Sequence, residues 1–309
     1  MGKLFWYLNR LQAMDLQEVC WRVQQRLLVK AEKRRFGKQR VRVDGEVWND
    51  ALRELGFDAG ALGINLDNAH YSTITEVHRL QGPDYGKWPD TFSYDLTYKQ
   101  RDDLGDARTC WEKHRHFRFA LLAKAAYVSG DSRLLAYLND EQDRWCEQHT
   151  FLHGIAWTSV MEVAIRAVNW MVTLAFCKDE KLAERLRTGV INMTDYLTRH
   201  YSRFSSANNH LLVEAAAIGL AGYAFGYRPW KELGMALLSK ELLNQNYEDG
   251  VNKELSLHYQ TFGMEAYCLM MRAMQAHDDE IPTTWYRMLS KQAERSEERR
   301  VGKECRSRW

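Results

Sequence analysis

The chain has 309 residues, a formal net charge of +2, 11 tryptophans and only 4 prolines. This length suffices for one large helical domain or two smaller ones, and the scarcity of proline favours long helices. No apolar run approaches about 20 residues, so no transmembrane helix is expected. The six cysteines are scattered without a Cys-x-x-Cys pair, so neither a zinc site nor a redox motif is indicated, and no metal or cofactor is expected.

The last fifteen residues, 295–309 (RSEERRVGKECRSRW), change composition abruptly and lack an apolar period. They resemble the translation of a sequencing-adaptor oligonucleotide. We therefore expect a non-native tail rather than a basic, disordered one, and a natural chain that is cut near residue 294. Without this segment, which holds six basic and three acidic residues, the formal net charge becomes −1. The overall charge gives no sign of a nucleic-acid partner, and any attraction for an anion must be local to a cleft.

Residues 1–42 form a first unit of amphipathic helices. Apolar residues at helical spacing predict a helix over Lys3–Gln12, and Asp15 with Glu18 has the form of a capping box that opens a second helix. This helix leads into a basic run over residues 30–42, including Arg42. The favoured interpretation is a solvated helix C-terminus, and the alternative is contact with an anionic membrane surface or polymer. Because the N-terminus lacks the long apolar centre of a signal peptide, the sequence as written predicts a cytoplasmic chain.

Residues 43–105 differ from the rest of the chain. Glycine and aspartate are frequent, the apolar period is weak, and two turn signals, Gly-Pro-Asp and Trp-Pro-Asp, lie at 82–84 and 88–90. This pattern predicts a long ordered loop with short strands or turns that crosses one face of the domain. Its dispersed aromatic residues either stack on the sugar rings of a ligand or pin the loop down, and the sequence leaves both readings open.

From residue 106 the pattern becomes regular and helical. Corresponding helices start about 50 residues apart, which is the spacing of stacked helical hairpins. Over residues 106–294 we therefore predict an all-α fold, an incomplete (α/α) toroid of antiparallel helical hairpins, with an open helical array as the alternative. The predicted helices are Ala107–Ser129, Ser132–Thr150, Thr158–Cys177, Glu180–Arg203, Asn209–Phe225, Pro229–Tyr247, Leu255–His277 and Pro282–Ala293.

Polar residues recur near the start of the first helix of each pair, and in a toroid these ends converge on one mouth. Pairs such as Glu112–Arg115 and Glu162–Arg166 have the alternative of merely bracing a single helix. It is the recurrence in four successive units that favours a functional interpretation. The four groups are Trp111, Glu112, Arg115 and His116; Trp157, Glu162, Arg166 and Asn169; Asn208, Asn209, His210 and Glu214; and Glu254, Ser256, His258 and Tyr259.

The third group lies in the stretch SSANNHLLVE, residues 205–214. Asn208 is a good N-cap, because its side-chain oxygen can accept an N–H of the first helical turn. One asparagine would suffice for a cap, but here Asn209 and His210 follow directly. A neutral amide and an imidazole at the positive end of a helix are well suited to hold a carboxylate.

Taken together, these blocks resemble the heparinase II/III family of polysaccharide lyases, which is related to alginate lyases, through its N-terminal toroid domain. The matching stretches run from about residue 80 to residue 270. They are GPDYGKWPDTF, DARTCWEKHRHFRFALLAKAAYVSGD, GIAWTSVMEVAIRAVNW, SSANNHLLVEAAAIG and EDGVNKELSLHYQTFGMEA.

The resemblance implies cleavage of a uronate-containing acidic polysaccharide by β-elimination, with no cofactor. Asn209 and His210 match the family's pair that caps the substrate carboxylate, and Tyr259 matches its proton-transferring tyrosine. Without the resemblance, Tyr259 is better explained as a core aromatic. Arg115, Arg166 and His258 are the cations expected near Tyr259, and the implied substrate-binding set is Trp111, Glu112, Arg115, His116, Trp157, Glu162, Arg166, Asn208, Glu254 and His258.

Two departures from the family pattern accompany the match. The family commonly has Tyr-His where this chain has His258-Tyr259-Gln260, and its members continue into a β-sheet domain that is expected to be missing here. The leading hypothesis is a lyase domain that is inactive or weak as this fragment. A non-catalytic polysaccharide-binding or exopolysaccharide-assembly module is the second, and a hydrolase that uses Asp249 and Glu254 is the third. Family resemblance gives the periplasm as the alternative compartment, and the oligomeric state stays open.

Overall fold

The computed structural model describes residues 14–64, 66, 83–99, 101 and 103–300, and for residues 296–300 the backbone alone. The helix predicted over Lys3–Gln12 lies outside this part of the chain, as does much of the segment 67–82. The described residues contain helices and two isolated bridges, Phe92–His153 and Asn246–Asn252. The all-α prediction is therefore confirmed, and of the short strands or turns expected within residues 43–105, the described part of that segment forms turns.

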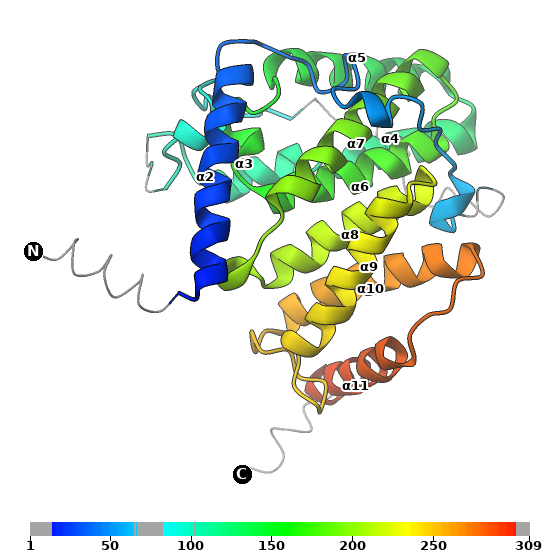
Figure 1. Ribbon diagram of the computed structural model, residues 1–309. Coiled ribbons are helices and arrows are strands. Elements are labelled where there is room, and N and C mark those ends of the chain that lie inside the picture. Colours follow the sequence, from blue (N-terminus) through cyan, green and yellow to red (C-terminus); the bar gives the residue numbers. More distant parts are fainter. Residues whose placement is uncertain (1–13, 65, 67–82, 100, 102, 301–309) are drawn as a thin grey trace, which may run out of the picture.

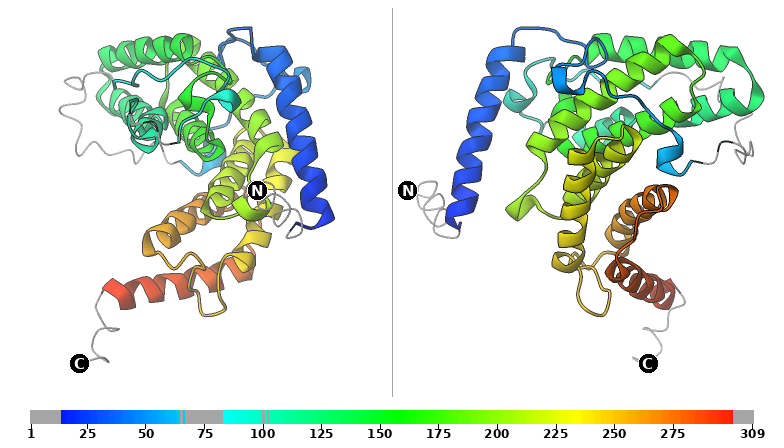
Figure 2. Two further views of the ribbon diagram at one scale, coloured as in Figure 1. Left: turned by 90° about the vertical axis from the view of Figure 1, so that its left-hand side faces the viewer. Right: turned by 45° about the vertical axis from the view of Figure 1, so that its right-hand side comes forward.

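Four antiparallel helix pairs follow one another from one end of the molecule to the other (Figures 1 and 2). The first helices of successive pairs pack side by side, α4 on α6, α6 on α8 and α8 on α10, so the predicted stack of hairpins is confirmed. The pairs are α4 (Phe117–Ser129) with α5 (Ser132–Gln148), α6 (Val160–Phe176) with α7 (Glu180–His200), α8 (Asn209–Ala224) with α9 (Arg228–Asn244), and α10 (Leu257–Ala276) with α11 (Thr283–Arg300).

The predicted helix Ala107–Ser129 is wrong as a single element. It is divided into α3 (Ala107–His114) and α4, and His116 between them adopts a left-handed conformation with φ 60°. Side chains of α6 stabilise the break: Asn169 Nδ2 donates to the carbonyl of Arg115 at 2.9 Å, and Trp170 Nε1 donates to His116 Nδ1 at 2.8 Å. These partners lie more than fifty positions away, so the helical period of the segment could not reveal them.

Helix α8 lies at the centre of the stack and packs on α6, α9 and α10. Nearly all of its residues are buried, as expected for a helix that is apolar on every side. Its closest approach is to α9, where a Cβ atom on Gly234 would lie 2.5 Å from Gly219 Cα and 2.7 Å from the Ala215 carbonyl oxygen. Glycine is therefore required for these two helices to pack at this distance.

Gly234→Ala is expected to lower the free energy of unfolding by about 2–3 kcal/mol, because the added methyl group must push two helix backbones apart. Urea unfolding followed by circular dichroism measures this effect. Gly56→Ala is the matched control, because a Cβ at that position meets nothing within 4 Å. Equal stability of the two variants would contradict the close packing of α8 on α9.

Helix α2 (Leu16–Phe36) stands at one edge of the molecule (Figure 1). The capping predicted from Asp15 and Glu18 is confirmed, since Asp15 Oδ1 accepts the Glu18 N–H at 2.7 Å. The chain then crosses over α5 and α7, and only the 3₁₀ turns Asp50–Leu52, Gly60–Leu62 and Ser93–Asp95 are regular in the described part of residues 37–105.

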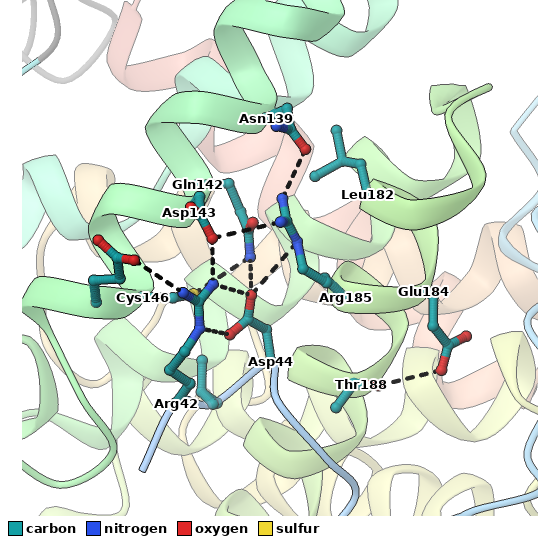
Figure 3. Close-up of polar contacts among 12 residues, drawn as sticks. Arg42, Asp44, Asn139, Gln142, Asp143, Cys146, Leu182, Glu184, Arg185 and Thr188 are labelled. Atoms are coloured by element: carbon teal, nitrogen blue, oxygen red, sulfur yellow. Dashed lines mark hydrogen bonds and ion pairs between the residues drawn. The ribbon is translucent and has the colours of Figure 1, made fainter. Parts of the chain in front are cut away.

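A buried carboxylate anchors the start of this crossing segment (Figure 3). Asp44 accepts from Arg42 Nε at 2.9 Å and from Gln142 Nε2 at 2.8 Å, and Arg185 Nε lies 3.7 Å away. Arg42 also reaches Asp143 on α5 at 2.6 Å. Burial raises the pKa of Asp44, but these hydrogen bonds outweigh it and hold that pKa below its usual value. Arg42 therefore belongs to a structural network rather than to the solvated basic run that the sequence suggested.

Helix α11 continues to Arg300, past the predicted end at Ala293 and past the change in composition at residue 295. The foreign origin of residues 295–309 stays a prediction. Within the described residues, no helix combines the length and the apolar character that crossing a membrane requires.

Candidate functional site

The corner before α8 presents two of the predicted catalytic residues. Asn208 is the N-cap of α8, and its Oδ1 accepts the His210 N–H at 3.1 Å, which confirms the predicted cap. Asn209 is buried, and its side-chain oxygen has no hydrogen-bond partner among the described residues. Burial lowers the pKa of His210, and the charges of Glu162 and Glu254 oppose that shift. At neutral pH this corner therefore offers an amide and an uncharged imidazole to a ligand.

Two further predicted residues, Arg115 and Glu162, form a pair between elements. Arg115 donates from Nε to Glu162 Oε2 at 2.6 Å and from Nη2 to Oε1 at 3.0 Å, a bidentate arrangement. Burial lowers the pKa of Arg115, but Glu162 outweighs it and raises that pKa. Glu162 therefore pairs with Arg115 and not with Arg166 on its own helix, which was the alternative. The pair joins the end of α3 to the first turn of α6.

Glu254 brings the segment before α10 to the same mouth. Its Oε1 accepts the Asn209 N–H at 3.1 Å, and its own N–H is held by Asn252 Oδ1 at 2.9 Å. The charges of Glu162 and Glu254 both raise the pKa of His210, so each carboxylate interacts electrostatically with this imidazole. The hydrogen bond between Glu254 and the Asn209 N–H thus joins the segment before α10 to the start of α8.

Tyr259 lies in the first turn of α10 and is 42% exposed, so it is available to a ligand rather than part of the core. The exposed His258 is its neighbour, with ring centroids 5.8 Å apart. The sequence did not single out Arg108, whose pKa is raised mainly by Asp106 and additionally by the charge of Tyr259. Arg108 was missed because, beside the N-cap Asp106, it resembles an ordinary helix-start residue.

An open pocket of about 630 Å³ adjoins Arg108. Trp111 forms part of its wall and is fixed by a hydrogen bond from Nε1 to Thr158 Oγ1 at 3.0 Å. The lining combines aromatic and charged side chains, which suits a sugar ring that carries acidic groups. The lining residues are Tyr98, Lys99, Arg101, Gly105, Asp106, Ala107, Arg108 and Trp111.

Three of the predicted substrate-binding residues, His116, Trp157 and Arg166, lie inside the protein instead of at this mouth. Arg166 is fully buried between the rings of Trp145 and Trp157, at 4.7 and 4.9 Å from guanidinium carbon to centroid. His116 is held by Trp170 and stacks on Phe119. A set of buried side chains therefore supports the mouth from behind. Glu112, by contrast, is exposed on α3 and contributes to the raised pKa of Arg115.

The family model described as the heparinase II/III N-terminus matches residues 10–297. The chain belongs to the heparinase II/III family. It is 27% identical to a heparin-sulfate lyase of Bacteroides thetaiotaomicron over 196 residues, 59% of this chain and 28% of that protein. A heparin-sulfate lyase of Bacteroides stercoris is 24% identical over 185 residues, 51% of this chain and 28% of that protein. The chain therefore spans less than a third of the length of these curated relatives.

Solved structures give the same fold. A crystal structure of heparinase III superposes with a TM-score of 0.55 at 22% identity, over 86% of this chain and 41% of that chain. A mutant heparan sulfate lyase from Pedobacter heparinus gives a TM-score of 0.50 at 18% identity, over 87% and 43%. These likenesses confirm the fold prediction, an incomplete helical toroid. Among the described residues of this heparinase II/III chain, no group of three or more His, Cys, Asp or Glu side chains could hold a metal ion.

The loop before Asn209 and His210 in this heparinase II/III domain is held from two sides. Glu214, one turn further along α8 and fully buried, accepts the Ser202 N–H at 2.6 Å and lies 3.0 Å from Ser202 Oγ. From α2, Glu32 lies 2.9 Å from His200 Nε2, and Arg22 donates to Ser205 Oγ at 3.3 Å. These contacts fix both ends of the segment between α7 and α8.

Glu214 should make the stability of the domain depend on pH. Burial raises its pKa from 4.5 to about 8, although the Ser202 hydrogen bonds oppose the shift. The folded state therefore retains a proton that the unfolded state loses, so stability is full below about pH 4.5 and falls as pH rises through about 8. Glu214→Gln should flatten this fall, which is at most about 4 kcal/mol between about pH 5 and pH 8.

Urea unfolding at several pH values measures this slope. Glu265→Gln on the exposed side of α10 is the control, because its carboxyl group remains in solvent. If the stability of the Glu214→Gln variant fell with pH as steeply as that of the wild type, Glu214 would have to be ionised in the folded state.

Proposed function

We propose that this chain is the helical domain of a polysaccharide lyase that cleaves a uronate-containing polysaccharide by β-elimination. Heparin- and heparan-like, alginate-like and exopolysaccharide chains all supply the required uronate. Elimination removes the proton at C5 of the uronate and expels the substituent at O4, leaving a double bond between C4 and C5. The obstacle is the weak acidity of a proton next to a carboxylate anion, because the resulting dianion is unstable.

The corner before α8 supplies what this chemistry needs. Hydrogen bonds from Asn209 and His210 to the uronate carboxylate would stabilise the negative charge that develops there in the transition state. The buried environment strengthens these bonds, and the N-terminal end of α8 adds its positive dipole. An imidazole that is neutral at pH 7 can still donate one N–H, and burial favours this form of His210.

Tyr259 is the proposed proton-transfer group. Its exposed side chain lies in the first turn of α10, whose preceding segment contacts Asn209 through Glu254. The exposed phenol can serve as the acid that protonates the leaving O4, whereas a tyrosine of ordinary pKa near 10 serves as a base only where a cation lowers that pKa. The observation that carries the proposal is the hydrogen bond between Asn209 and Glu254, which lies five positions before Tyr259, in a chain of the heparinase II/III family.

The decisive assay incubates the protein at high concentration with uronate polymers and records the ultraviolet absorbance of unsaturated products together with new reducing ends. Equal growth of both signals supports elimination. New reducing ends without the absorbance would show hydrolysis. Tight binding of a polymer with neither signal would favour a binding or assembly module over a lyase.

A further inference from the structure

Three arginines of the pocket and of α3, namely Arg101, Arg108 and Arg115, have carboxylate partners. Arg115 is paired with Glu162 at 2.6 Å. Arg108 Nη2 lies 2.9 Å from Asp106 Oδ2, and Arg101 Nη2 lies 2.7 Å from Asp103 Oδ2. In each pair the pKa of the arginine is raised by its partner, although burial opposes this in Arg115, so both members remain charged at neutral pH.

Two further carboxylates, Glu254 and Glu112, add negative charge to the site. Glu254 contacts the Asn209 N–H, and Glu112 lies close enough to Arg115 to raise its pKa. The residues named for this mouth and its pocket thus comprise four cations, Lys99, Arg101, Arg108 and Arg115, and five carboxylates, Asp103, Asp106, Glu112, Glu162 and Glu254. The described site is therefore nearly neutral, despite its arginines.

This balance distinguishes between two kinds of acidic polysaccharide. A heavily sulfated chain carries several negative charges in each disaccharide, and holding it requires cations that are not already neutralised. An arginine that keeps its own aspartate presents almost no net charge to a sulfate, and the aspartate repels it. A single uronate carboxylate, by contrast, can be held by the neutral donors Asn209 and His210 and by the helix dipole.

Resting on the proposed function, we infer that this site takes a uronate polysaccharide whose carboxylates are its only anionic groups, and that it discriminates against sulfated chains. The paired acids Asp103 and Asp106 are the specificity-determining residues, because they cancel the cations that a sulfate would otherwise meet. The relatives named as heparin-sulfate lyases do not decide this point, since the charge balance belongs to residues of this chain.

The test compares heparin with the same polymer after complete O- and N-desulfation and subsequent N-acetylation of the freed amines, so that the two ligands share one backbone. At about 0.15 M salt, the desulfated chain is expected to bind at least as tightly as heparin. Heparin affinity should also change little with salt, because few counterions are released when the site is neutral. Tenfold tighter binding of heparin, with a steep salt dependence, would overturn the inference while leaving the lyase proposal intact. Alginate serves as a second polymer whose carboxylates are its only anionic groups, and binding of none of the three polymers would overturn both proposals.

A variant that removes the two aspartate charges gives the second arm. Asp103→Asn combined with Asp106→Asn should raise heparin affinity at least about fivefold at low salt and leave the desulfated polymer unaffected, because two arginines lose their partners. Asparagine keeps the N-cap that Asp106 provides to α3. Unchanged heparin affinity in this variant would contradict the assigned role.

The chain contains a matched control for this variant. Asp131 caps α5 and pairs with Arg133 at 2.8 Å, in the same Asp-x-Arg arrangement as Asp106 and Arg108. Asp131→Asn therefore frees an equivalent arginine away from the mouth. Heparin affinity is expected to stay at the wild-type value, and a gain equal to that of the double variant would show that the effect is a non-specific response to net charge.

Discussion

Replacing Tyr259 by phenylalanine is expected to lower the rate of unsaturated product formation about 10²–10⁴-fold, the usual contribution of one general acid–base group. The phenol is the only part of the side chain that can exchange a proton, and the ring is 42% exposed, so its loss should not disturb the core. Affinity for the polymer is expected to stay within about twofold, because the proposed function assigns the carboxylate to Asn209 and His210 rather than to the tyrosine.

Tyr286→Phe provides the control, since Tyr286 on α11 has a similar exposure of 46%. Rates of product formation and polymer affinity should be measured for both variants under identical conditions. Undiminished turnover in the Tyr259→Phe variant would remove Tyr259 from the chemistry and, with it, the assignment of this mouth as a lyase site.

The features predicted correctly from the sequence depend on neighbours along the chain. The N-cap at Asn208 and the capping at Asp15 follow from contacts two or three residues apart. The helix pairs follow from apolar periodicity and from glycine at turns, such as Gly130 after α4 with φ 70°. Because these signals depend on residues that are close in the sequence, they do not depend on the tertiary contacts of the rest of the chain.

The features that the sequence missed depend on tertiary contacts. Arg115 lies three positions from Glu112 and Glu162 four positions from Arg166, so each has a plausible partner on its own helix. In the folded chain, Arg115 and Glu162 instead bind each other across 47 positions. Arg108 gave no signal, because its role depends on α10, which lies about 150 positions away in the sequence. Local pairing rules cannot choose between a neighbour in sequence and one in space.

Arg166 provides the sharpest contrast between sequence and structure. Its position among the recurrent polar residues near the helix starts gave it a predicted substrate-binding role, but its guanidinium is fully buried. Nε donates to the His114 carbonyl at 3.0 Å, and Nη2 donates to the Ala156 carbonyl at 2.6 Å. These carbonyls belong to the end of α3 and to the turn Ile155–Trp157, so Arg166 joins two segments that carry mouth residues. Burial lowers its pKa to about 10, which leaves it charged at neutral pH.

Arg166→Met is expected to lower the free energy of unfolding by about 3 kcal/mol. Two buried carbonyl groups lose their donor, and each unpaired group costs about 1–3 kcal/mol, which is partly offset because a buried charge is also removed. Arg166→Lys should fall between the wild type and Arg166→Met, since one ammonium group cannot reproduce the two-sided geometry of a guanidinium. Urea unfolding measures the stability of the three proteins. Polymer affinity is then measured on each at a urea concentration below its unfolding transition, so that a loss of binding can be distinguished from a loss of folded protein. An Arg166→Met variant of wild-type stability that no longer binds polymer would restore the substrate-binding role, because a structural clamp cannot be removed without destabilising the fold.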